Sequence, residues 1–111
     1  MTLRPPRASS STPQLAALDY EIAQERASAL GRLGRALEIA LAALSAYEGA
    51  QAQPSVEPGR MRARLVQEAS EALWCYMVQR EACGLRDPRA VMRDYRVPAE
   101  VQNRMGAFGC R

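Results

Sequence analysis

The sequence predicts an all-α protein: a long antiparallel helical hairpin followed by two short C-terminal helices, paired with a second copy into a dimeric helical bundle. Three observations lead to this prediction. Apolar residues recur at steps of three and four along the first half of the chain, the spacing that places them on one face of a helix. Glycine- and proline-rich segments divide the remainder into further helices. The first helix is also longer than a chain of this size can cover by itself.

The first helix is expected to begin near Ser11 or Thr12, either of which can cap it, with Pro13 suited to the first helical position. Its apolar stripe consists of Leu15, Leu18, Ile22, Ala29, Leu33, Leu37, Ala40 and Leu44. At about 1.5 Å per residue the helix spans roughly 50 Å, whereas a globule of this chain length is only about 35 Å across. We therefore expect a homodimer in which a second copy covers part of the stripe.

The second helix is predicted over residues 59–83, after a loop without apolar periodicity that permits an antiparallel return. Gly84 follows it and can adopt the left-handed conformation that ends many helices. A third helix is expected over residues 88–95, after the capping residue Asp87, because Val97 precedes a proline and so avoids helical angles. A fourth is predicted over 98–105, before Gly106.

Residues 12–106 are predicted to form a single helical domain, with a disordered tail over residues 1–11 and a C-terminal tail over 107–111. The first tail carries arginine, proline and serine without the apolar segment of a secretion signal. No apolar run approaches the roughly 20 residues that a membrane-spanning helix needs. We expect a cytoplasmic protein without contact to a membrane.

The composition argues against catalysis, because the chain has no histidine and all 15 of its basic residues are arginine. The commonest general base, the commonest metal ligand and every amine nucleophile are therefore missing. The net charge of +3 matches the three arginines of the predicted tails, Arg4, Arg7 and Arg111, so the folded part is nearly neutral. The sequence predicts no enzyme, no catalytic residue, no cofactor and no metal, and it disfavours nucleic acid as a partner.

Three cysteines, Cys75, Cys83 and Cys110, lack the spacing of a metal site. Cys75 and Cys83 lie on the same predicted helix about 12 Å apart, which is too far for a disulfide. We expect both to be inert packing residues in a reducing cytoplasm.

Ala27, Gly31, Gly34 and Trp74 are the candidate residues for a protein interface. Each glycine in the middle of a helix costs about 1 kcal/mol relative to alanine, so a close approach of another backbone is expected there. That crossing is either between subunits or inside the monomer, and Trp74 is an anchor for either a second subunit or the C-terminal helices. Acidic residues precede the glycines and basic ones follow them, so an antiparallel pair of copies would set acid against base: Asp19, Glu21 and Glu25 against Arg32 and Arg35.

Two further features have alternative interpretations. Arg60, Arg62 and Arg64 crowd the start of the second helix and either hold an anion or pair locally, as Arg64 would with Glu68.

Residues 87–105 resemble a degenerate helix-turn-helix, which makes a DNA-binding regulator the alternative function. Arg96 stands where that motif often has glycine, so we favour a packing cap over the hairpin. An enzyme that uses carboxylates, arginine and tyrosine is the third, least favoured, reading.

Residues 79–87 and 91–101, together with 18–37, resemble a family of small uncharacterised helical proteins of alphaproteobacteria, a domain of unknown function. The resemblance implies a bacterial, cytoplasmic protein and supplies no activity, cofactor or residue role. The favoured function is a small helical interaction or scaffolding protein, non-catalytic and homodimeric, whose further protein partner is left open.

Overall fold

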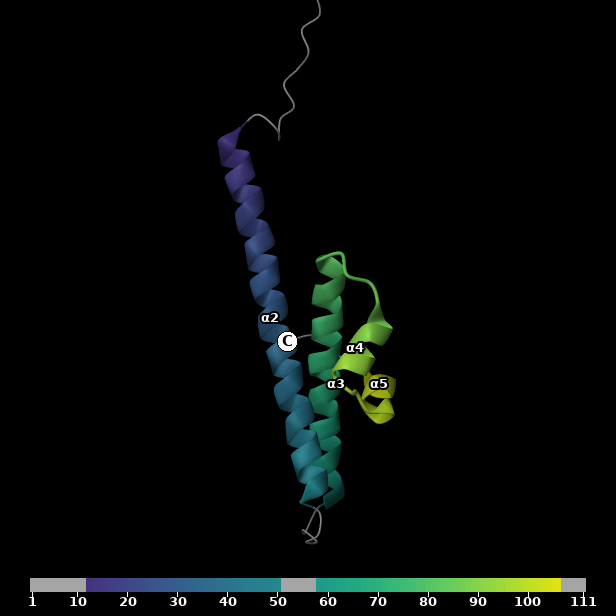
Figure 1. Ribbon diagram of the computed structural model, residues 1–111. Coiled ribbons are helices and arrows are strands. Elements are labelled where there is room, and N and C mark those ends of the chain that lie inside the picture. Colours follow the sequence, from purple (N-terminus) through teal and green to yellow (C-terminus); the bar gives the residue numbers. More distant parts are fainter. Residues whose placement is uncertain (1–11, 51–57, 107–111) are drawn as a thin grey trace, which may run out of the picture.

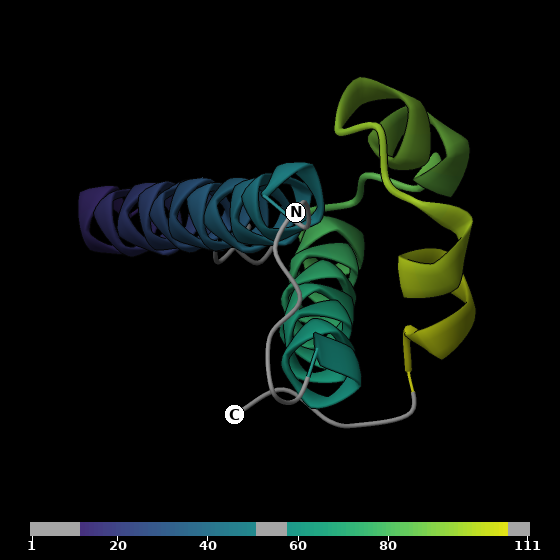
Figure 2. The same cartoon turned by 90° about the horizontal axis from the view of Figure 1, so that it is seen from below.

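The computed structural model describes residues 12–50 and 58–106, which form four helices and no strand. The helices are α2 (Pro13–Gly49), α3 (Pro58–Ala82), α4 (Pro88–Asp94) and α5 (Ala99–Arg104). α2 and α3 pack as an antiparallel hairpin, and α4 and α5 lie beside α3 (Figures 1 and 2). The predicted all-α hairpin with two short C-terminal helices is confirmed. The tails predicted over 1–11 and 107–111 lie outside the described residues.

The helix ends follow local sequence signals. Proline occupies the first turn of α2 and of α4, and the Asp87 carboxylate accepts a hydrogen bond from the Ala90 N–H at 3.4 Å. Gly84 ends α3 with φ +84°, as its position predicted. Arg96, which stands between α4 and α5, also adopts a left-handed conformation, with φ +52°. This turn therefore forms without the glycine that would relieve its strain.

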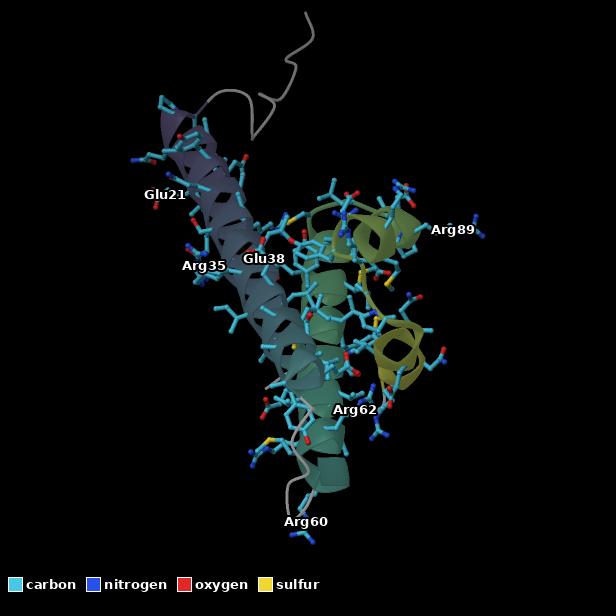
Figure 3. All side chains as sticks on the ribbon, turned by 60° about the horizontal axis from the view of Figure 1, so that its bottom comes forward. Glu21, Arg35, Glu38, Arg60, Arg62 and Arg89 are labelled. Atoms are coloured by element: carbon cyan, nitrogen blue, oxygen red, sulfur yellow. The ribbon has the colours of Figure 1, made fainter. Side chains whose placement is uncertain are left out.

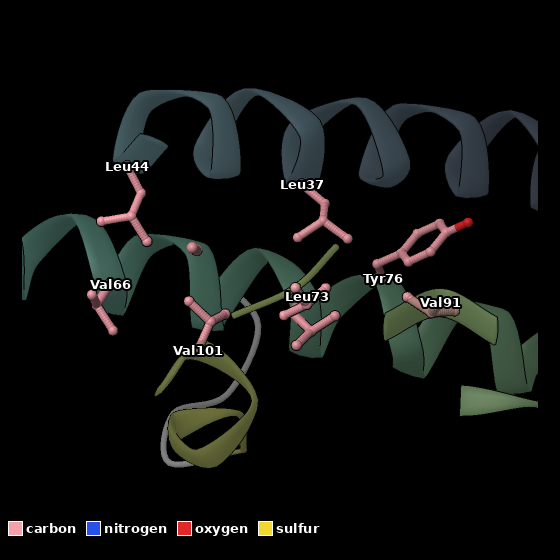
Figure 4. Close-up of a cluster of buried hydrophobic side chains, with 9 residues drawn as sticks. Leu37, Leu44, Val66, Leu73, Tyr76, Val91 and Val101 are labelled. Atoms are coloured by element: carbon pink, nitrogen blue, oxygen red, sulfur yellow. The ribbon is translucent and has the colours of Figure 1, made fainter. Parts of the chain in front are cut away.

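The hydrophobic core lies where α2, α3 and the C-terminal segment meet (Figure 4). Its buried members are Leu37 and Leu44 of α2, Val66, Ala69, Leu73 and Tyr76 of α3, and Val91, Val97 and Val101 of the C-terminal segment. None of them comes from the first 20 residues of α2. The core therefore holds together the loop-proximal half of the hairpin and leaves the start of α2 outside.

The start of α2 extends beyond the end of α3, because α2 has 37 residues and α3 has 25 (Figure 1). Gln79 and Cys83, at the end of α3, reach the Arg26 carbonyl oxygen at 3.4 and 3.8 Å. We call residues 13–25, which precede this contact, the α2 overhang. Its large apolar residues are exposed: Leu15 by 38%, Leu18 by 51%, Tyr20 by 68% and Ile22 by 42%.

Arg62 joins three helices by ion pairs. Its Nη2 lies 2.7 Å from Glu48 Oε2 of α2 and 2.8 Å from Glu100 Oε1 of α5. These carboxylates raise the pKa of Arg62, and Arg62 in turn lowers the pKa of Glu100. Arg64 donates to Met61 Sδ at 3.4 Å. Of the three clustered arginines, Arg62 is therefore a structural bridge across the hairpin.

Ser70 anchors α5 to α3. The side chain is fully buried, and its Oγ lies 2.8 Å from the Val66 carbonyl oxygen and 3.1 Å from that of Val101. Val101 is in the last turn of the short α5, where carbonyl groups lack intrahelical partners. The Ser70 hydroxyl thus supplies a donor to a helix end that packs against the core.

We expect Ser70→Ala to destabilise the fold by about 1–3 kcal/mol, because it removes a donor from a buried carbonyl group. Urea unfolding measures the change. Ser45→Ala, at an exposed position of α2, is the matched control and should have little effect. Equal stabilities of the two variants would show that the buried hydroxyl contributes nothing.

Candidate protein interface

The close approach at Gly34 occurs inside the monomer. A Cβ atom built on Gly34 would lie 3.0 Å from the Tyr95 hydroxyl oxygen and 3.2 Å from Tyr76 Cε1. A side chain at this position would therefore displace the two tyrosines from α2. Of the two interpretations of this glycine, the structure supports the intramolecular one.

Tyr76 and Tyr95 form an aromatic pair over this part of α2. Their ring centroids lie 5.5 Å apart at an interplanar angle of 68°, an edge-to-face arrangement. The guanidinium carbon of Arg80 lies 6.0 Å from the centroid of the Tyr76 ring. Burial, reinforced by a hydrogen bond with Tyr76, raises the pKa of Tyr95 to about 12. The tyrosine pair thus covers one side of α2.

Gly31 and Ala27, in contrast, are exposed. No atom lies within 4 Å of a Cβ built on Gly31. Both residues line a groove of about 440 Å³ beside the tyrosine pair, whose other lining residues are Leu30, Gly34, Arg35, Glu38, Tyr76 and Tyr95. A second hollow of about 270 Å³ continues past Ala27 towards Ala23 and Cys83. The four candidate residues therefore do not form a single surface.

Trp74 lies near the end of the C-terminal segment. It is half-buried, and two of its ring carbons lie 3.6 and 3.7 Å from the position of a Cβ atom on Gly106. Of the two roles considered for Trp74, this placement favours packing within the chain.

The expectation for Cys75 is wrong. Cys75 is disulfide-bonded, whereas Cys83 is a free thiol. The spacing argument excluded only a bond between these two residues, which lie on one helix. The distance between them says nothing about a disulfide from Cys75 to another part of the chain.

The segment that suggested a helix-turn-helix packs against the hairpin. Val101 of α5 is fully buried, and Glu100 is paired with Arg62 of α3. α5 has six residues, and one of its faces is turned towards α3. These contacts are those expected of a packing cap.

The outer side of α2 carries charged residues. In Figure 3, Glu21 and Arg35 project from α2 away from α3, and Glu38 lies on the side of the tyrosine pair. Arg32 Nη2 is 3.2 Å from Glu25 Oε1, and both side chains are largely exposed. Within residues 12–50 and 58–106, no three acidic, cysteine or histidine residues are placed to hold a metal ion. No helix in these ranges has the length and apolarity to cross a membrane.

The sequence did not identify the exposed apolar surface of the overhang as a site. Leu15, Leu18 and Ile22 were assigned to the apolar stripe, but the end of α3 near Arg26 leaves them uncovered. The signal that could have found them is the difference in length between the two predicted helices. This overhang is the candidate interface, whereas the exposed Ala27 and Gly31 lie on the side of α2 that faces the tyrosine pair.

Replacing each glycine by leucine should have different effects on the stability of the protein. Gly34→Leu should destabilise the protein by about 1–3 kcal/mol, because the side chain overpacks the tyrosine pair. Gly31→Leu should be neutral or stabilising by up to about 1 kcal/mol, since leucine is the better helix former and space is open. Urea unfolding of both variants measures the difference, and a larger loss at Gly31 would contradict this geometry.

The raised pKa of Tyr95 predicts a loss of stability at alkaline pH. A phenol whose pKa is higher in the folded state stabilises the fold below its unfolded pKa of about 10, and this contribution is lost as the pH rises towards about 12. Tyr95→Phe should remove part of the decline in unfolding free energy between about pH 10 and about pH 12. Tyr20→Phe, at an exposed position, is the control. An unchanged decline in Tyr95→Phe would contradict the prediction.

Comparison with known proteins gives a family without an assigned role. No curated protein and no solved structure matches the chain. The sequence matches the family of unknown function DUF6665 over residues 6–111, which is nearly its whole length. This chain therefore belongs to the family of unknown function DUF6665.

Proposed function

We propose that this protein is a non-catalytic helical interaction protein that assembles as a homodimer through the α2 overhang. The observation that carries the proposal is the exposure of Leu15, Leu18 and Ile22 on a helix that extends beyond its own hairpin. An exposed patch of apolar side chains on one helix face is typical of a protein interaction site. Three turns of isolated helix are also only marginally stable in water, so a partner would stabilise them.

The scaffolding role follows from the shape of such a dimer. Each copy would use its overhang for assembly and keep α3, α4 and α5 outside the contact, so two identical bodies would be held at a fixed separation. The missing histidine and lysine support a binding role over a catalytic one. A DNA-binding function remains the alternative prediction, and the packing of α5 against α3 gives it no support.

The cellular setting is a separate prediction. The resemblance to alphaproteobacterial proteins implies a bacterial cytoplasm, whereas a disulfide at Cys75 is more typical of an oxidising compartment. Thiol alkylation at the moment of lysis, followed by mass spectrometry of the peptide with Cys75, distinguishes the two. A fully alkylated Cys75 would support the cytoplasm.

The oligomeric state tests the proposal directly. Light scattering at micromolar concentration should give twice the chain mass for the natural protein. Ile22→Asp places a charge in the proposed contact and should give a monomer with an unchanged circular dichroism spectrum, because Ile22 packs against nothing in the core.

The matched control is Ile39→Asp, because Ile39 is a 63% exposed residue of α2 outside the overhang. This variant should remain dimeric. A natural protein that is monomeric at every accessible concentration would refute the homodimer. A dimer that persists in Ile22→Asp would place the contact elsewhere.

A further inference from the structure

The disulfide at Cys75 has one candidate partner within the chain. The sequence contains three cysteines, Cys75, Cys83 and Cys110. Cys75 is disulfide-bonded, whereas Cys83 is a free thiol. Elimination therefore leaves Cys110, which lies outside the described residues.

The C-terminal segment passes close to Cys75. Trp74 precedes Cys75 in α3, and two of its ring carbons lie 3.6 and 3.7 Å from the position of a Cβ atom on Gly106. Gly106 is four residues before Cys110. Four extended residues span up to about 14 Å, and the two Cα atoms of a disulfide lie within about 7 Å of each other. The chain is therefore long enough to join Cys110 to Cys75.

Packing fixes the position of the chain up to Gly106. Val101 is fully buried, and its carbonyl oxygen lies 3.1 Å from Ser70 Oγ of α3. Met105 packs against the core, and Gly106 adopts φ +90°, a conformation that glycine allows readily. The fold itself thus brings the end of the described segment to the turn of α3 that carries Cys75.

We infer that Cys75 and Cys110 form a disulfide, which closes a ring of chain that includes α4 and α5. When it forms, a bond joins the two Sγ atoms, and two electrons and two protons pass to a small-molecule disulfide such as oxidised glutathione, which is reduced to two thiols. The bond fastens the C-terminal segment covalently to α3. The inference does not depend on the proposed homodimer.

The ring includes the residues through which the C-terminal segment reaches the hairpin. Tyr95 contacts α2 at Gly34, and Val101 packs in the core. A helix as short as α5, with six residues, is not stable by itself. Closing a ring of about 35 residues reduces the entropy of the unfolded chain and raises the folding equilibrium constant by roughly 10²–10³-fold. Reduction removes this contribution and leaves only the packing contacts.

Peptide mapping tests the pairing. Trypsin cleaves after arginine and places the three cysteines on three peptides, residues 65–80, 81–86 and 105–111. The natural protein is treated with oxidised glutathione, alkylated and digested without reduction. Mass spectrometry should show peptide 65–80 joined to peptide 105–111, and peptide 81–86 alkylated. Non-reducing electrophoresis should show the mass of one chain.

Any product in which Cys110 is not joined to Cys75 of the same chain would overturn the inference. Such products are an alkylated Cys110, a bond between Cys75 and Cys83, and two chains linked to each other.

Urea unfolding tests the effect of the ring. After oxidation, Cys110→Ser should have a folding equilibrium constant roughly 10²–10³-fold below that of the natural protein. In dithiothreitol the two proteins should be equally stable. Cys83→Ser is the matched control, because Cys83 is a free thiol, and it should lose as much stability on reduction as the natural protein does.

Equal stabilities of Cys110→Ser and the natural protein after oxidation would overturn the proposed ring. A difference that persists in dithiothreitol would also overturn it, because Cys110 would then act through packing.

Discussion

The contact of Tyr76 and Tyr95 with Gly34 decides which face of α2 remains available to other molecules. A Cβ atom at position 34 would lie 3.0 Å from the Tyr95 hydroxyl oxygen, so the absence of a side chain at Gly34 lets the tyrosine pair pack closely on α2. This contact joins the C-terminal segment to both helices of the hairpin. In the part of α2 that packs in the hairpin, the side that carries Arg32, Arg35 and Ile39 is exposed.

The helices were predictable from the sequence because their signals are local. Pro13, Asp87 and Gly84 act on the residues next to them, and all four observed helices agree with the predicted ones to within a few residues. The sequence did not predict which of the two glycines makes a close contact with other side chains. Gly31 and Gly34 have the same local cost, and only the tyrosines, more than 40 positions away along the chain, distinguish them.

The ion pairs of Arg62 were likewise not predictable from the sequence. From the sequence it belongs to a cluster of three arginines, and the nearest acid at helical spacing, Glu68, pointed to a local pair for Arg64. In the structure Arg62 instead pairs with Glu48 and Glu100, which are 14 and 38 positions away. Its bridge ties the loop-proximal end of the hairpin to α5. Long-range pairs of this kind depend on the packing of whole helices, which periodicity does not specify.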